Sequence, residues 1–330
     1  MFNNLINRHD LSRCIYGLRH GYLKTMISRL TKGRLGRVED QWKITKRGRA
    51  TTWWMIPGIK KRCNYLITGN EDADYYRYVA DTYLSGKHGL VALSLGCGNG
   101  HRERIWAGLA DFERIEGCDL SDSRVKAATI AAEKAGLSEK LIYRQGDLAA
   151  LDLEENRYDV IFVEMSLHHF SPLEEILIKI NRWLKPGGLF VVNEYVGPSR
   201  FQWTSRQLQA ANGALSILPG KYKKHVVHGS QIKKIVRPSR FSMMMKDPSE
   251  AVESEKIMPL LKHHFTLVEE RPYYGTVLHL LFNGIAGNFI SDDQGTQRLF
   301  KLCLDIEDTL ACAGDIGSDF TLAICRKKSR

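Results

Sequence analysis

The chain has 330 residues, of which 43% are hydrophobic and 26% charged, the composition of an ordinary soluble globular protein. It contains no run of 18 apolar residues, and its first ten residues lack the apolar core of a secretory signal. Composition therefore argues against a membrane-spanning segment and against secretion. The seven cysteines are scattered without a Cys-x-x-Cys pair, which predicts reduced thiols in a cytoplasmic protein.

The net charge of +11 is concentrated at the N-terminus. Residues 1–62 hold 15 Lys and Arg against 3 Asp and Glu, whereas the remainder holds 33 against 34. This asymmetry points to an anionic partner for residues 1–62, with a membrane surface and RNA as candidates, or else to a solvated basic face. Residues 11–30 predict a basic amphipathic helix that either caps the main domain or docks peripherally on a membrane.

Residues 50–85 predict a helical lead-in, so residues 1–85 are interpreted as a basic helical extension, or cap, preceding a domain over 86–330. Trp53 and Trp54 fit either the core of this cap or a lid that stacks on a substrate. The core interpretation is favoured.

From about residue 88, short apolar runs alternate with helical patterns. Strands are predicted at 91–95, 114–118, 141–145, 158–163 and 189–194. Helices are predicted at 101–110, at 122–135 and from Pro172, with Ser171 as N-cap and Gly187-Gly188 as the stop. Five strands alternating with helices predict a parallel, doubly wound sheet.

Two segments interrupt this alternation. Residues 197–263 are polar and basic, and residues 272–318 read mainly as helical, while 265–270 and 320–325 predict two further strands. Both segments are interpreted as insertions on the core sheet. Long insertions near the carboxyl edge of a sheet are where substrate specificity is usually built.

Glycines and acids follow the predicted strands. The turn Gly96-Cys97-Gly98-Asn99-Gly100 follows the first strand, where missing side chains let the backbone approach a ligand. Asp119 ends the second strand, where a carboxylate can accept both hydroxyls of a ribose. Asp147 follows the third strand, where an acid can accept an adenine amino hydrogen and the adjacent Leu148 can stack on the ring.

These features occur together with Leu-His-His-Phe at 167–170 and Leu-Lys-Pro-Gly-Gly at 184–188. As a set, residues 88–196 resemble the class I S-adenosylmethionine-dependent methyltransferases of the small-molecule branch, which includes quinone-biosynthesis enzymes. The resemblance implies an α/β fold with a Rossmann-like, doubly wound sheet of seven strands, the last antiparallel, and S-adenosyl-L-methionine as cofactor. The cofactor contacts it implies are Gly96, Cys97, Gly98, Asp119, Leu120, Asp147, Leu148 and Glu164, with Met165 as the alternative to Glu164. About 49 residues separate the last two predicted strands, where the family usually has a tight hairpin.

Methyl transfer from a sulfonium is an in-line displacement, so the protein aligns the reactants and, for a hydroxyl nucleophile, removes a proton. The loop after the fourth strand borders the methyl group in this fold. His168 and His169 are therefore candidate bases, with His168 preferred and a structural role for the pair as the alternative. Glu194 at the end of the fifth strand is a further catalytic candidate. Arg200 is either a ligand for a substrate phosphate or carboxylate, or a structural ion pair.

The sequence predicts no metal site, because His225, His228, His263 and His264 lack a consistent set of further ligands nearby. The function predicted from the resemblance is O-methylation of a small molecule, a lipid-linked intermediate or a glycan. Two alternatives remain open, an RNA methyltransferase that uses the basic N-terminus and a non-catalytic scaffold on the same fold.

Overall fold

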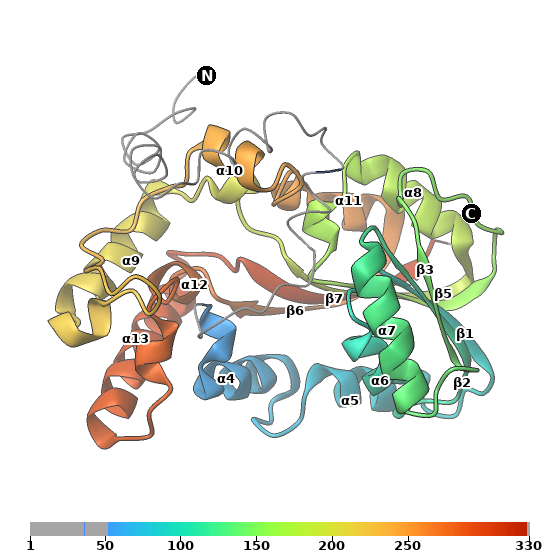
Figure 1. Ribbon diagram of the computed structural model, residues 1–330, viewed down its shortest axis with the longest axis horizontal. Helices are drawn as coiled ribbons and strands as arrows, with labels where there is room; N and C mark the ends of the chain where they lie inside the picture. The colour runs from blue at the N-terminus through green and yellow to red at the C-terminus, as the bar shows by residue number, and fades with distance from the viewer. Residues whose placement is uncertain (1–35, 37–51, 329–330) are drawn as a thin grey trace.

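The computed structural model describes residue 36 and residues 52–328 (Figure 1). The amphipathic helix predicted over 11–30, and most of the basic segment 1–62, lie outside the described residues. Among the described helices, none is both long and apolar enough to cross a membrane.

Seven strands form one mixed sheet in the order β3-β2-β1-β4-β5-β7-β6. The strands are β1 (Leu90–Leu95), β2 (Phe112–Asp119), β3 (Leu141–Gln145), β4 (Tyr158–Glu164), β5 (Leu184–Tyr195), β6 (Phe265–Tyr274) and β7 (Phe320–Lys327). The pairs among β1 to β5 are parallel, and β7 runs antiparallel to both β5 and β6. The predicted seven-stranded, doubly wound sheet with an antiparallel last strand is therefore confirmed.

Helices cover both faces of the sheet, and this explains why the central strands are almost continuously apolar. The helices are α4 (Pro57–Thr68), α5 (Tyr75–Val79), α6 (His101–Ala107), α7 (Asp122–Lys134), α8 (Leu173–Trp183), α9 (Ser205–Ile217), α10 (Arg240–Lys246), α11 (Ile257–His264), α12 (Leu278–Leu281) and α13 (Gln294–Cys312). One buried cluster joins α8 and α11 to the sheet. The other face is covered by α4, α6 and α7, with Trp106 and Phe162 stacked at 4.4 Å between ring centroids.

The segments on either side of β6 add helices at one end of the sheet. The chain between β5 and β6 forms α9, α10 and α11, and the chain between β6 and β7 forms α12 and α13. Helices α9, α12 and α13 lie together beyond the strand ends, at the left of Figure 1. The carboxyl ends of the parallel strands thus face residues from a segment far along the chain.

The lead-in helix α4 is fixed to this helical end by a buried ion pair. Arg62 is 7% exposed, and its guanidinium lies 3.0 Å from the Glu307 carboxylate of α13. Trp53 is 2% exposed and packs against Phe320 of β7, as the core interpretation predicts, whereas Trp54 is 40% exposed.

The start of α8 differs from its prediction. The helix begins at Leu173, with Pro172 in extended conformation at the N-cap and no capping bond from Ser171. The backbone N–H of Leu173 donates to Glu253 Oε2 at 3.1 Å instead. Because this acceptor comes from a segment 80 residues away, the local sequence could not predict it. The helix also ends at Trp183, before Gly187-Gly188.

Candidate active site

A cavity of about 350 Å³ lies at the carboxyl ends of β1 to β4. We call it the first cavity. Its size is in the range of small-molecule sites, about 300–1,000 Å³. Its walls come from the loops that follow four strands, and they include Gly96, Asp119, Leu120, Arg124, Asp147, Leu148, Met165, Ser166, His169, Phe170 and Ser249.

The glycine turn after β1 brings backbone into contact with the loop after β4. Gly96 has φ 74°, and a Cβ there would lie 2.5 Å from Ser166 Cβ. The N–H groups of Gly96 and Cys97 both donate to the carbonyl of Cys118, at 2.8 and 3.1 Å. A side chain at position 96 would therefore clash inside the site, in addition to the strain of positive φ.

Asp119 is held at the cavity wall by two backbone donors. Its Oδ2 accepts from Gly98 N at 2.8 Å, and its Oδ1 accepts from Ser121 N at 2.9 Å. Each carboxylate oxygen can accept a second hydrogen bond. The carboxylate is thus fixed in position and retains acceptor capacity toward the cavity.

Most of the predicted cofactor residues lie at the first cavity. Those whose atoms line it are Gly96, Asp119, Leu120, Asp147 and Leu148. Gly98 shapes it through Asp119, and the Cys97 side chain is buried.

The carboxylate of Glu164, in contrast, does not line the first cavity. Its carboxylate accepts from the Tyr75 hydroxyl and from Trp106 Nε1 at 3.2 Å, on the face covered by α6. Burial raises the pKa of Glu164, and the charge of Arg102 opposes that shift. Met165, which follows it, lines the cavity.

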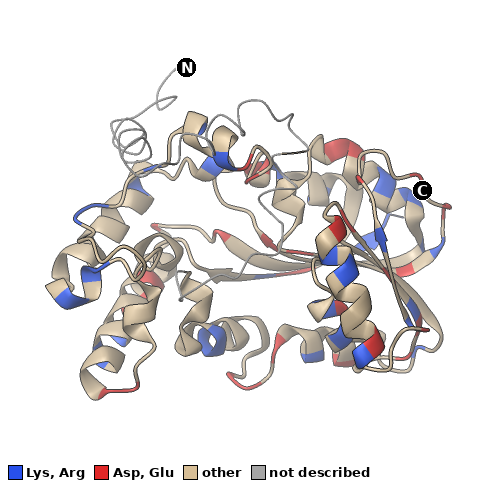
Figure 2. Cartoon of the chain, viewed as in Figure 1, with Lys and Arg blue, Asp and Glu red and all other residues tan. Residues whose placement is uncertain are grey.

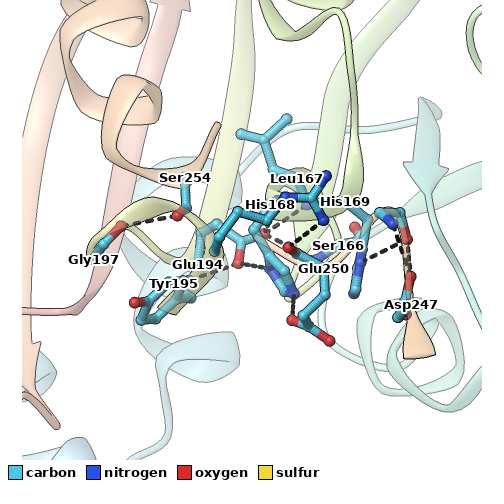
Figure 3. Close-up of polar contacts among 12 residues, drawn as sticks. Ser166, Leu167, His168, His169, Glu194, Tyr195, Gly197, Asp247, Glu250 and Ser254 are labelled. Carbon is cyan, nitrogen blue, oxygen red and sulfur yellow. Dashed lines mark hydrogen bonds and ion pairs between the residues drawn. The ribbon is translucent and has the colours of Figure 1, made fainter. Parts of the chain in front are cut away.

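Glu194 holds the loop that follows β4 (Figure 3). It is fully buried, and its Oε2 accepts from the backbone N–H groups of Ser166 at 2.9 Å and Leu167 at 2.6 Å. Its Oε1 lies 2.5 Å from His168 Nδ1. These contacts give Glu194 a positioning role behind the cavity wall.

His168 lies between two carboxylates. Its Nδ1 faces Glu194, and its Nε2 lies 3.5 Å from Glu250 Oε1. Burial alone would lower the pKa of His168, but Glu194, and after it Glu250, outweigh burial and raise it to about 10. An imidazole ring that keeps its proton at neutral pH is a poor general base. The two neighbouring carboxylates therefore disfavour His168 as the base, although the sequence analysis preferred it.

His169 lines the first cavity. Burial, and next the charge of His168, lower its pKa to about 4, so its ring is neutral at neutral pH. Its Nδ1 lies 3.2 Å from Ser249 Oγ, and the Ser249 hydroxyl donates to Asp247 Oδ1 at 2.6 Å. His169 is thus the candidate base that the structure brings to the cavity.

Asp247, Ser249 and Glu250 come from the segment between β5 and β6, and sequence reasoning missed all three. Arg200 fixes this segment, because its guanidinium donates to the carbonyls of Pro248 at 2.8 Å and Glu250 at 3.1 Å. No motif marks these residues. Only the position of the segment near the carboxyl edge of the sheet could have drawn attention to it.

A second cavity of about 710 Å³ continues beyond Glu250. Aromatic and aliphatic side chains form part of its wall, including Phe201, Trp203, Met243 and Leu280. Lys233, Lys234 and Lys246 also line it, and Figure 2 shows that Lys and Arg recur along the segment between α9 and α10. Asp247 and Glu250 line this second cavity, next in sequence to Ser249 of the first.

Comparison with known proteins defines the class of this core. Residues 93–192 match the family model described as a methyltransferase domain. A sterol 24-C-methyltransferase of Gibberella zeae is 34% identical over 110 residues, 33% of this chain and 29% of the relative. A demethylmenaquinone methyltransferase of Bacteroides fragilis is 34% identical over 89 residues, 27% of this chain and 36% of the relative. The chain thus spans about a third of the length of these relatives.

A solved structure extends the likeness of the fold to most of the chain. The geranyl diphosphate C-methyltransferase from Streptomyces coelicolor A3(2) superposes with a TM-score of 0.50 at 13% identity, covering 90% of this chain and 99% of the other. The sheet order, the glycine turn and the match over 93–192 show that this chain contains a methyltransferase domain with the fold of the class I S-adenosylmethionine-dependent enzymes. The predicted resemblance to that class is therefore confirmed for this domain.

Proposed function

We propose that this protein transfers the methyl group of S-adenosyl-L-methionine to an oxygen atom of a small lipophilic molecule. The observation that carries the proposal is the first cavity, where a glycine turn and the fixed Asp119 carboxylate lie at the carboxyl ends of parallel strands. Asp119 accepts the ribose hydroxyls, and Asp147 with Leu148 binds the adenine. The methyl group then points toward His169.

The second cavity is the proposed acceptor site. It adjoins the first through the segment 247–250, and its apolar side chains suit a lipophilic body. Two relatives are named for a sterol and for demethylmenaquinone, both small lipophilic molecules. These names favour a small molecule over RNA or a glycan. Oxygen is proposed as the accepting atom because imidazole and carboxylate groups, which suit a hydroxyl, meet between the cavities.

The basic segment 1–62 is proposed to bring the enzyme to an anionic membrane surface, where lipophilic acceptors dissolve. Its support is the charge asymmetry of the sequence. Flotation with vesicles of anionic lipid should recover the full-length chain at low salt and release it at high salt. Equal flotation with neutral vesicles would contradict an electrostatic attachment.

The test of the proposed function uses methyl-labelled S-adenosylmethionine with a lipid extract and, separately, with total RNA. Label should enter the lipid fraction with the wild type and with Asp152→Ala, an exposed acid outside the cavity, and not with Asp119→Ala. Mass spectrometry of the product should place the label on oxygen. Label confined to RNA, label on carbon, or no transfer to either fraction would contradict the proposal.

A further inference from the structure

The wall of the second cavity combines an apolar surface with an excess of positive charge. The rings of Phe201 and Trp203 stack at 5.8 Å between centroids, and Leu280 of α12 belongs to the same wall. The charged residues that line the cavity are four basic and two acidic, namely Lys233, Lys234, Arg237, Lys246, Asp247 and Glu250. The cavity thus offers an apolar surface to the body of a ligand and positive charge to a polar end.

The two acids of the wall are bonded to neighbouring side chains. Asp247 Oδ1 accepts from the N–H of Ser249 at 2.9 Å and from its hydroxyl at 2.6 Å. Glu250 Oε1 lies 3.5 Å from His168 Nε2. Burial would raise the pKa of Glu250, but the hydrogen bond with His168 and nearby positive charge, including that of Lys246, lower it to about 2. Glu250 is therefore ionised at neutral pH.

One of the basic groups also has structural partners. The guanidinium of Arg237 donates to the carbonyl of Trp203 and to Ser205 Oγ at 3.2 Å, so it fixes the wall. Lys233 and Lys234 differ, because their side chains make no ion pair or hydrogen bond within residue 36 and residues 52–328. We call these two residues the lysine pair. Their ammonium groups are available to a ligand.

The backbone that carries the lysine pair is fixed on both sides. Before the pair, the N–H of Ile232 donates to the carbonyl of Lys223 at 2.9 Å. After it, Asn212 of α9 accepts from the N–H of Ile235 at 2.8 Å and donates to the carbonyl of Ile235 at 2.9 Å. Ile232 and Ile235 pack against the core, and the lysines between them are exposed. A ligand therefore meets a preformed segment, which reduces the ordering cost of binding.

We propose that the second cavity binds an acceptor whose apolar body carries an anionic group, a phosphate or a carboxylate, and that the lysine pair binds this group. An ammonium group presents three N–H donors to such an anion as a point charge. A neutral acceptor would leave the pair without counter-charge.

The charges on the wall also orient this acceptor, and its role as acceptor rests on the proposed function. Ionised Glu250 repels an anion from its own part of the cavity. Asp247 and Glu250 stand on either side of Ser249, which lines the first cavity. The lysine pair lines the second cavity and not the first. The anionic group therefore lies at the lysine pair, and an uncharged hydroxyl of the acceptor faces the methyl donor.

The test is calorimetric titration of three ligands into the full-length protein at low salt: decyl phosphate below its micelle concentration, 1-decanol and inorganic phosphate. The wild type should bind decyl phosphate at least about fivefold more tightly than either of the others, since only decyl phosphate has both the apolar body and the anion. Lys233→Gln/Lys234→Gln should weaken the binding of decyl phosphate at least about fivefold. Its binding of 1-decanol should equal that of the wild type.

The matched control is Lys221→Gln/Lys224→Gln. It removes the same charge from exposed positions earlier in the same segment, and neither residue lines a cavity. This variant should bind decyl phosphate as the wild type does, because exposed charges outside the site are screened by salt. Circular dichroism confirms that each variant is folded.

Three results would overturn the anion site: equal affinities of the wild type for decyl phosphate and 1-decanol, inorganic phosphate bound as tightly as decyl phosphate, or equal weakening in the two double variants. Titration of S-adenosylhomocysteine into the same samples separates the two proposals. Binding of that nucleoside without lysine-dependent binding of decyl phosphate refutes the anion site alone. Lysine-dependent binding of decyl phosphate without nucleoside binding supports the anion site and refutes the proposed function.

Discussion

The carboxylate of Glu194 is fully buried behind the wall of the first cavity and is surrounded by donors. It accepts from the backbone N–H groups of Ser166, Leu167 and Tyr195, and it pairs with His168. Burial of a charge is costly unless such donors are present. The same bonds that offset this cost fix the loop bearing His168 and His169, so β5 orders the loop that follows β4.

At the residue scale, we predict that Gly96→Ala impairs both folding and cofactor binding. The substitution adds positive-φ strain of about 1–2 kcal/mol and a clash with the Ser166 side chain. The affinity for S-adenosylhomocysteine should fall at least about tenfold, because relief of the clash moves the cavity wall. Calorimetry measures the affinity, and urea denaturation measures the free energy of unfolding.

Gly86→Ala is the control for this prediction. Gly86 has φ 71°, and a Cβ there would meet nothing within 4 Å. Gly86→Ala should therefore add a similar strain energy to the folded protein. Its affinity for S-adenosylhomocysteine should remain that of the wild type. Equal affinities in the two variants would show that the close contact at Gly96 does not shape the site.

The sequence predicts where strand ends place residues of the site, but it does not predict in which direction every side chain points. Gly96 and Asp119 stand at strand ends, where a turn and a strand direction fix them locally. Glu164 is the last residue of β4, and successive side chains of a strand alternate between faces. Its carboxylate therefore meets Tyr75 and Trp106, a direction that the motif alone does not specify.

At the scale of elements, the ion pair between α4 and α13 is predicted to be essential for stability. Glu307 is fully buried, pairs with Arg62, and accepts from the N–H groups of Gly275, Val277 and Leu278. Glu307→Ala should lower the free energy of unfolding by about 3–5 kcal/mol, because it leaves three buried N–H groups without their acceptor and the buried Arg62 with Asp308 as its remaining carboxylate partner. Urea denaturation measures this loss.

The exposed pair Lys301–Asp305 in the same helix is the matched control. Asp305→Ala removes an ion pair of α13 without uncovering a buried charge, so its effect on stability should be small. If the two variants lost equal stability, the attachment of α4 through Arg62 would be unimportant.

The buried Asp319 before β7 is predicted to make stability depend on pH. Burial, and next the charge of Glu307, raise the pKa of Asp319 to about 8, and hydrogen bonds from Gln207 offset part of the shift. The unfolded chain ionises this group near pH 4. Stability from the protonated carboxyl is thus complete below about pH 4 and is lost as the pH rises toward 8.

Asp319→Asn removes this titration and keeps an acceptor for Gln207. At pH 8 the variant should melt at least about 2 °C higher than the wild type, and the difference should shrink toward pH 5. Thermal unfolding followed by circular dichroism measures it. A constant difference across this range would contradict the prediction, because it would mean that Asp319 does not contribute a pH-dependent stability between pH 5 and pH 8.

The segment between β5 and β6 shows why elements outside the sheet were hard to predict. It brings Glu253 to the first N–H of α8, and it brings Asp247, Ser249 and Glu250 to the loop that follows β4. These are contacts across about 80 residues of sequence. Local patterns such as a capping box do not report them.

At the scale of the whole molecule, the sheet was predictable because its signals are local and repeated. Short buried runs such as Leu90–Leu95, each followed by a helix, define a parallel sheet, and a right-handed crossover leaves few arrangements. The packing of α9, α12 and α13 around Trp203 and Leu280 has no such repeat. The second cavity, which depends on that packing, was therefore not predicted.

The central claim is that the first cavity binds the methyl donor through Asp119. It is tested most directly by calorimetric titration of S-adenosylhomocysteine into the wild type, Asp119→Ala and Asp152→Ala. Loss of a hydrogen bond to a charged group costs about 1.5–3 kcal/mol, so Asp119→Ala should bind about tenfold to about 150-fold more weakly. Asp152→Ala should match the wild type. Failure of the wild type to bind, or equal binding by Asp119→Ala, would contradict the account.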